Sequence, residues 1–335
     1  MVSFVIKKSA IPIVWIDTSI ITNMTIARVN PKQLDQRQLK RIRTLYNDIK
    51  FATREGKVIC PLSSQEQEVW INRDEWMNTI HDLGLGITCN CSKNIQDAQI
   101  KAAMEAYSSG KEKVILSYTD MFESDPVEKT KELQNQSLFV TVKHGVFRGQ
   151  EYQKSKKTVL LKKLNNQRLR NVKNKVKFSD QLKKEQTGEL EALIISANKV
   201  LKGQTNKDTD GEISDLFAQY ELIKQIKELA QLKGMKTDIS DLTDFYKSEF
   251  NTCLPYNNIS AHMYAKIMVD PQEIKSGDPM DIEHASMMLP YVDLFITDKH
   301  WRTFLNQHKF DETYKTKVCY IGDTETISSF FSKLE

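Results

Sequence analysis

Residues 11–19 read Ile-Pro-Ile-Val-Trp-Ile-Asp-Thr-Ser, and this stretch decides the predicted fold. Residues 11–16 form a continuous apolar run, which is typical of a strand buried on both faces of a parallel sheet. Asp17 closes this run, and Asp298 closes a second apolar run at 294–297. Because ligands of open parallel sheets collect outside the carboxyl ends of the strands, we expect both carboxylates at one edge of a sheet.

Further strand and helix signals alternate around these two runs. Strands are predicted at 11–16, 57–60, 292–297 and 318–321, and helices at 32–55, 94–109, 279–289 and 324–334. Gly56 marks the end of the first helix, and Ser63 or Ser64 can cap another helix after Pro61. This alternation predicts an α/β fold in which helices flank an open parallel sheet.

The middle of the chain has a different composition. From 151 to about 250 it is rich in Lys, Gln, Asn and Glu, and its apolar residues follow a helical period without a strand pattern. The sequence therefore predicts one α/β domain built from 10–125 and 255–335. A mostly helical insertion at 126–254 interrupts it.

The basic part of this insertion is residues 151–184, which hold twelve Lys or Arg residues against two acidic ones. Such a stretch binds phosphate backbones by counterion release, and a solvated helical face is the alternative interpretation. The candidate nucleic-acid contacts are Lys156, Lys157, Lys162, Lys163, Arg168 and Arg170. The insertion is also a candidate surface for a regulatory partner or a second copy of the chain.

Composition excludes several other classes of protein. The net charge is +4, and the apolar run that follows Lys7 and Lys8 is too short for a signal peptide or a membrane span. Five cysteines without paired Cys-x-x-Cys motifs indicate neither a disulfide framework nor a zinc ribbon. No phosphate-binding loop or dinucleotide fingerprint occurs. We expect a cytoplasmic protein that has no membrane partner.

Acidic residues recur where predicted strands end or helices begin. Glu66 and Glu68 follow the strand at 57–60, and Asp281 lies in the first turn of the helix that follows Asp278. Clustered carboxylates repel one another, and Mg²⁺ or Mn²⁺ would balance their charge. A structural role is open for each: Asp17 and Asp278 can cap helices, Glu66 can complete a capping box, and Asp298 can begin a turn.

In this order the motifs resemble those of PIN-like nucleases. They are Val-Trp-Ile-Asp17-Thr-Ser19, the strand–helix junction at 61–68, Asp278-Pro-Met-Asp281-Ile-Glu-His284-Ala285, and Phe-Ile-Thr297-Asp298. The resemblance covers roughly 10–125 and 255–335, and it implies a parallel sheet and a Mg²⁺- or Mn²⁺-dependent nuclease. One departure from compact members is that more than 200 residues separate Glu68 from Asp281.

The resemblance also implies roles for individual residues. Asp17, Asp281 and Asp298 would be the metal ligands, and either Glu66 or Glu68 would act through water. Ser19 and Thr297 would position the phosphate or the acids by hydrogen bonds. His284, which lies three residues after Asp281 on the same helical face, is a substrate contact or a structural histidine.

The first hypothesis is therefore a metal-dependent endonuclease that acts on single-stranded nucleic acid, with RNA favoured over DNA. A toxin or defence effector and an RNA-processing enzyme both fit this activity. The alternative is a non-catalytic nucleic-acid- or protein-binding module, favoured if the acids fail to converge or if a lysine occupies the metal position. A phosphatase with Asp17 as nucleophile is disfavoured, because Ser19 stands where a second aspartate is needed.

Overall fold

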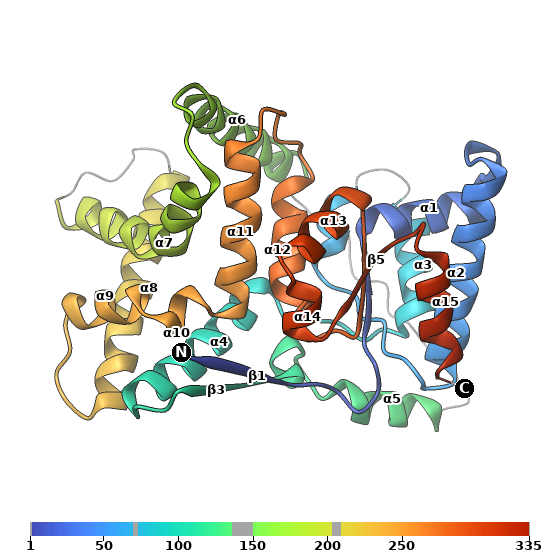
Figure 1. Ribbon diagram of the computed structural model, residues 1–335, viewed down its shortest axis with the longest axis horizontal. Helices are drawn as coiled ribbons and strands as arrows, with labels where there is room; N and C mark the ends of the chain where they lie inside the picture. The colour runs from blue at the N-terminus through green and yellow to red at the C-terminus, as the bar shows by residue number, and fades with distance from the viewer. Residues whose placement is uncertain (1, 70–72, 136–149, 203–208, 335) are drawn as a thin grey trace. The chain divides into compact units, whose positions relative to one another are not determined.

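The computed structural model describes residues 2–69, 73–135, 150–202 and 209–334 (Figure 1). The chain forms two compact units. The sheet unit comprises Ile6–Ile95, Ser117–Lys157 and Pro279–Glu335, and the helical unit comprises Met1–Val5, Gln96–Leu116 and Thr158–Asp278. These boundaries differ from the predicted ones, because residues 96–116 and the helix at 255–269 belong to the helical unit.

The sheet unit is built on parallel strands. Strand β2 (Val14–Ile16) pairs with β4 (Leu294–Thr297), and β4 pairs with β5 (Lys317–Tyr320). On the other side of β2, parallel bridges join Ile13 to Ile59 and Leu62 to Thr88. Numbered along the chain, the five segments are β2, the segment at 59–62, the segment around Thr88, β4 and β5. Across the sheet they lie in the order 3-2-1-4-5. This is a doubly wound order that reverses between the first and fourth segments, which are β2 and β4.

One face of this sheet carries the main hydrophobic cluster. The side chains of Val14, Ile16, Leu294 and Ile296 alternate onto it, as the two-residue period of a strand requires. The helices that cover it are α1 (Thr18–Val29), α2 (Gln36–Arg54), α3 (Arg73–Gly84) and α15 (Thr324–Ser332). On the opposite face Trp15 stacks on Phe295 with ring centroids 4.6 Å apart. The continuous apolar pattern of the strands is thus explained by burial on both faces.

Capping residues set the helix starts in this unit. Asp35 and Gln38 form a capping box, so that the predicted helix at 32–55 is a short 3₁₀ turn, η1 (Pro31–Gln33), followed by α2. Gly56 ends α2 with φ of +65°, a conformation that costs glycine little. After Ser63 the chain first forms a 3₁₀ helix, η2 (Ser64–Glu68), and the predicted helix follows as α3, which carries Trp76 and Ile80.

The remaining elements of the sheet unit are mostly short helices. They are η3 (Tyr118–Met121), α5 (Pro126–Gln134), α12 (Asp278–Met288), α13 (Lys299–Gln307) and α14 (Phe310–Tyr314). α12, β4, β5 and α15 lie within two residues of their predicted bounds. α13 and α14 were not predicted.

The helical unit confirms the expected helices in the middle of the chain. Its helices, some of which begin or end at the unit boundary, are α4 (Ser92–Ser108), α6 (Gln150–Lys173), α7 (Phe178–Leu201), α8 (Thr209–Lys233), α9 (Ile239–Lys247), α10 (Glu249–Thr252) and α11 (Pro255–Val269). α7 packs against both α8 and α11. Strands β1 (Ser3–Lys7) and β3 (Lys113–Ser117) pair in a small sheet that was not predicted. No helix in the described part of the chain is long and apolar enough to cross a membrane.

Candidate functional site

Asp17 and Asp298 follow neighbouring strands at the point where the strand order reverses. Ile16 is in register with Ile296, and the Asp17 backbone N–H donates to the carbonyl oxygen of Ile296 at 2.9 Å. Crevices at such reversal points are where open α/β sheets bind ligands. The predicted placement of the two aspartates at one edge of the sheet is therefore confirmed.

Both aspartates also cap helices. Oδ1 of Asp17 accepts from the Ser19 backbone N–H at 2.7 Å at the start of α1. Oδ1 of Asp298 accepts from the Trp301 backbone N–H at 2.8 Å at the start of α13. The N-cap role considered for Asp17 is correct, and Asp298 caps a helix instead of merely beginning a turn. These caps fix the position of both carboxyl groups.

Asp281 of α12 joins this pair through its own carboxyl group. It is hydrogen-bonded to the Asp17 carboxyl group, and its Oδ2 accepts from the indole Nε1–H of Trp301 at 3.2 Å. Burial raises the pKa of Asp17, and the negative charge of Asp298 raises it further, whereas hydrogen bonds from Ser19 and Asp281 oppose the shift. Burial and the neighbouring charge of Asp298 therefore favour the neutral form of the Asp17 carboxyl group.

Glu68 is the acid of η2 that lies beside these groups. Its Oε2 accepts from the Thr18 hydroxyl at 2.7 Å, and the Lys157 ammonium lies 3.9 Å from its Oε1. Burial raises the pKa of Glu68; Thr18 and Lys157 oppose this shift, while the charges of Asp17 and Glu283 add to it. The side chain of Glu66 lies outside the described residues.

Sequence reasoning missed Lys157 and Glu283 as neighbours of this site. Lys157 was predicted as a nucleic-acid contact, and its ion pair with Glu68 joins residues almost ninety positions apart. Glu283 was not singled out, because two residues after Asp281 a helical side chain normally points elsewhere. No sequence signal identifies either contact.

The carboxyl groups at this site provide only part of the coordination that Mg²⁺ or Mn²⁺ needs. Among the described residues, no three His, Cys, Asp or Glu side chains converge closely enough to hold a metal ion. Asp17 and Asp281 meet directly, whereas Asp298 is exposed and acts on Asp17 through its charge. Mg²⁺ is commonly held by one or two carboxylates together with waters and substrate phosphates. The residues present can therefore supply two ligands, with Asp298 close to them.

The three predicted positioning residues differ in accessibility. Ser19 is exposed and hydrogen-bonds Asp17, as expected of a group that orients the acids. Thr297 is buried in β4, where it pairs with Tyr320, and it does not line an open surface. His284 is fully buried, and its ring lies 5.2 Å from that of Trp15.

His284 is therefore the structural histidine that the sequence left as one of two alternatives, and its burial contradicts the other, a substrate contact. Its Nε2 lies 3.1 Å from the Ser64 hydroxyl. Burial, with a smaller effect of Lys157, lowers the pKa of His284 to about 3, so that the ring is neutral at physiological pH. Three residues separate His284 from Asp281, so both lie on the same side of α12. His284 packs against Trp15 of the sheet.

The candidate nucleic-acid contacts on α6 also separate into exposed and buried residues. Lys162, Lys163 and Arg170 are exposed. Arg168 is 5% exposed, and its guanidinium donates to the backbone carbonyl oxygens of Asp270 at 3.1 Å and Pro271 at 2.7 Å. The buried Arg168 is thus not available to a phosphate, contrary to the prediction. The side chain of Lys156 lies outside the described residues.

Comparisons with family models, curated proteins and solved structures found no match to this chain. The resemblance to PIN-like nucleases therefore stays a prediction from the four motifs.

Proposed function

We propose that the sheet unit is a PIN-like, Mg²⁺- or Mn²⁺-dependent endonuclease that cleaves single-stranded nucleic acid, RNA in preference to DNA. The observation that carries this proposal is the meeting of the carboxyl groups of the buried Asp17 and of Asp281, with the charge of Asp298 beside them at the strand-order reversal. A protein that buries like charges without a cation loses stability, and such arrangements cluster at functional sites.

Asp17 and Asp281 would hold the cation through their carboxylate oxygens. The bound metal supplies an activated water and neutralises charge that develops on the phosphate. Trp301 orients Asp281 through its indole N–H, and the cap bonds orient Asp17 and Asp298. The side chain of the exposed Ser19, which hydrogen-bonds Asp17, would position this acid or a phosphate oxygen. The exposed Lys162, Lys163 and Arg170 support an anionic polymer as the class of substrate.

The test is cleavage of single-stranded RNA and DNA of one sequence in Mn²⁺, Mg²⁺ or EDTA. Wild type is compared with Asp17→Asn and Asp281→Asn, and Asp74→Asn is the matched control because Asp74 is exposed in the first turn of α3 and was not predicted to be a site residue. We expect metal-dependent cleavage by wild type and Asp74→Asn, and none by the other two. If all four proteins cleave alike, the assignment of the acidic site is wrong.

A second candidate function is a non-catalytic binding module on the same fold. Two observations favour it: the Lys157 ammonium lies 3.9 Å from Glu68, and no three-ligand group occurs among the described residues. Lys157 and the neutral form of Asp17 that burial favours would then balance the acids without a metal ion.

Thermal unfolding with Mn²⁺ separates the two candidates. A cation at one hundred times its Kd stabilises a specific site by about 2.7 kcal/mol. Stabilisation that disappears in Asp17→Asn favours the nuclease. Nucleic-acid binding without cleavage and without stabilisation by Mn²⁺ favours the binding module.

A further inference from the structure

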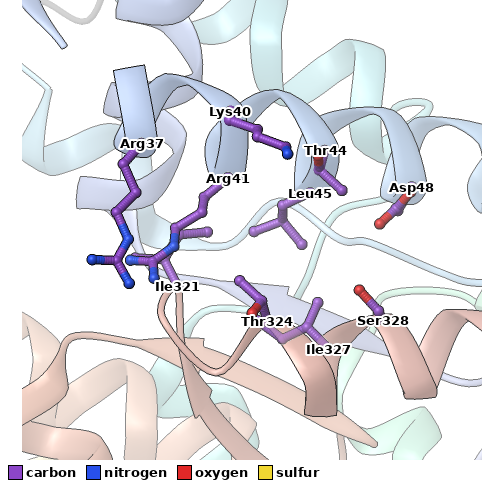
Figure 2. A pocket seen from close by; sticks show the side chains of 10 residues that line it. All are labelled: Arg37, Lys40, Arg41, Thr44, Leu45, Asp48, Ile321, Thr324, Ile327 and Ser328. Carbon is purple, nitrogen blue, oxygen red and sulfur yellow. The ribbon is translucent and has the colours of Figure 1, made fainter. Parts of the chain in front are cut away.

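An open groove of about 320 Å³ lies between α2 and α15 of the sheet unit (Figure 2). The two helices pack together, and Leu45 and Ile327 give the groove an apolar floor that belongs to the main hydrophobic cluster. Figure 2 shows the guanidinium groups of Arg37 and Arg41 together at one end. Asp48 lies at the other end. The groove is therefore polarised along its length.

The cations at this groove have no acidic partner. The side chains of Arg37, Lys40 and Arg41 line one face of α2 at the spacing that brings helical side chains together. Within the described residues, none of the three forms an ion pair. Further along the same helix, Lys50 and Arg54 both pair with Asp82, at 2.6 and 2.9 Å. The charge of α2 is thus neutralised at its C-terminal end and left unbalanced at the groove.

The start of α15 adds positive potential to the same groove. Thr324 is the first residue of α15 and lines the groove. The preceding Asp323 makes no side-chain cap bond to α15, because its carboxylate accepts from Arg302 at 2.9 Å and from the Tyr320 backbone N–H at 3.1 Å. The first-turn N–H groups of α15 therefore have no side-chain cap and favour an anion, an effect that the charge of Glu325 in the same turn reduces.

The opposite end suits a different chemistry. Asp48 forms no salt bridge with any Lys, Arg or His among the described residues, and burial raises the pKa of its carboxyl group. A carboxyl group there repels a phosphate but accepts hydrogen bonds from the N–H groups of a heterocycle. Between the two ends, Leu45 and Ile327 offer apolar surface, and Thr44 and Ser328 offer hydroxyl groups.

We propose that this groove binds a nucleoside 5′-phosphate, either free or at the phosphorylated end of a strand. Arg37, Lys40 and Arg41 hold the phosphate, and Asp48 accepts from the base. The volume lies within the range of about 300–1,000 Å³ found for small-molecule sites. A second hollow of about 440 Å³ shares Asp48 and Ser328 and continues to the exposed Phe51, which can stack on the base of a following nucleotide.

Binding here requires neither the acidic site nor a metal ion, so the test is calorimetric titration in EDTA. The probes are the four ribonucleoside 5′-monophosphates, inorganic phosphate, and a short RNA with and without a 5′-phosphate. Arg37→Gln/Arg41→Gln should weaken nucleotide binding by about tenfold or more, the loss expected for hydrogen bonds to a charged group. Asp17→Asn should bind like wild type, which separates this proposal from the nuclease.

Lys32→Gln/Arg43→Gln is the matched control, because both residues are exposed near or on α2 and neither lines the groove. It removes the same charge and should change affinity less than about twofold. Asp48→Asn should change base preference without altering binding of inorganic phosphate.

Binding of only the 5′-phosphorylated RNA would identify a strand end as the ligand. The proposal is overturned if no probe binds, if the control weakens binding as much as Arg37→Gln/Arg41→Gln, or if inorganic phosphate binds as tightly as every nucleotide.

Discussion

Replacement of Asp298 by Asn or Ala separates its role as the cap of α13 from the role of its negative charge at the acidic site. Its Oδ1 caps α13 by accepting from the Trp301 backbone N–H at 2.8 Å. Asparagine caps a helix about as well as aspartate, whereas alanine has no acceptor and costs typically about 1 kcal/mol. Either change removes a negative charge from an exposed helix N-terminus, which costs about 0.3–1 kcal/mol. We therefore expect a loss of about 1–2 kcal/mol for Asp298→Ala, and of at most about 1 kcal/mol for Asp298→Asn.

The assay is urea unfolding of both variants, together with RNA cleavage in Mn²⁺. In a protein of this size each kcal/mol shifts Tm by about 2–4 °C, so that thermal unfolding also resolves the two variants. If the charge of Asp298 serves the reaction, both variants lose cleavage although only Ala loses the cap. The loss of RNA cleavage would then be the same in both variants, although their free energies of unfolding differ.

Asp35 provides the control for this experiment. It caps α2 by accepting from the Gln38 backbone N–H at 2.7 Å, and it lies outside the acidic site. Its Asn and Ala variants should show the same difference in stability and leave cleavage unchanged. Equal destabilisation by Asn and Ala at position 298 would refute the capping argument. Wild-type cleavage by Asp298→Asn would leave the cap as the role of this residue.

Three further predictions follow from burial. Asp17→Asn should gain stability relative to wild type as pH rises from about 4 to 7 in urea unfolding, because the raised pKa of the buried Asp17 makes its ionisation unfavourable in the folded state. His284 stays neutral in the folded protein down to about pH 3 but is protonated near pH 6.5 when unfolded. Stability should therefore fall as pH is lowered through that window, by up to about 1.4 kcal/mol per pH unit, and His284→Gln should flatten the profile. Arg168→Met should cost about 2 kcal/mol in unfolding experiments, because it leaves two backbone carbonyl groups without their donor, whereas the exposed Arg170→Met should cost less than about 0.5 kcal/mol.

The fold was largely predictable where local pattern and burial agree. The apolar runs at 11–16 and 292–297 became β2 and β4 because a strand buried on both faces needs apolar side chains throughout. β1 and β3 were missed, although β3 alternates between exposed residues and the buried Val114 and Leu116, because both strands are short and pair only with each other. The unit boundaries were also missed, because they depend on how helices such as α7 and α11 pack.

The apolar runs before Asp17 and Asp298 were enough to predict that both residues follow buried strands, and parallel strands bring such residues to one edge of a sheet. The other groups that meet them became known only from the packing of the folded chain. Asp281 hydrogen-bonds to Asp17, Lys157 lies beside Glu68, and His284 is sealed against Trp15. The physical reason is that local pattern fixes the direction of a side chain relative to its own strand or helix. Its partners depend on the packing of segments that lie far apart in the chain.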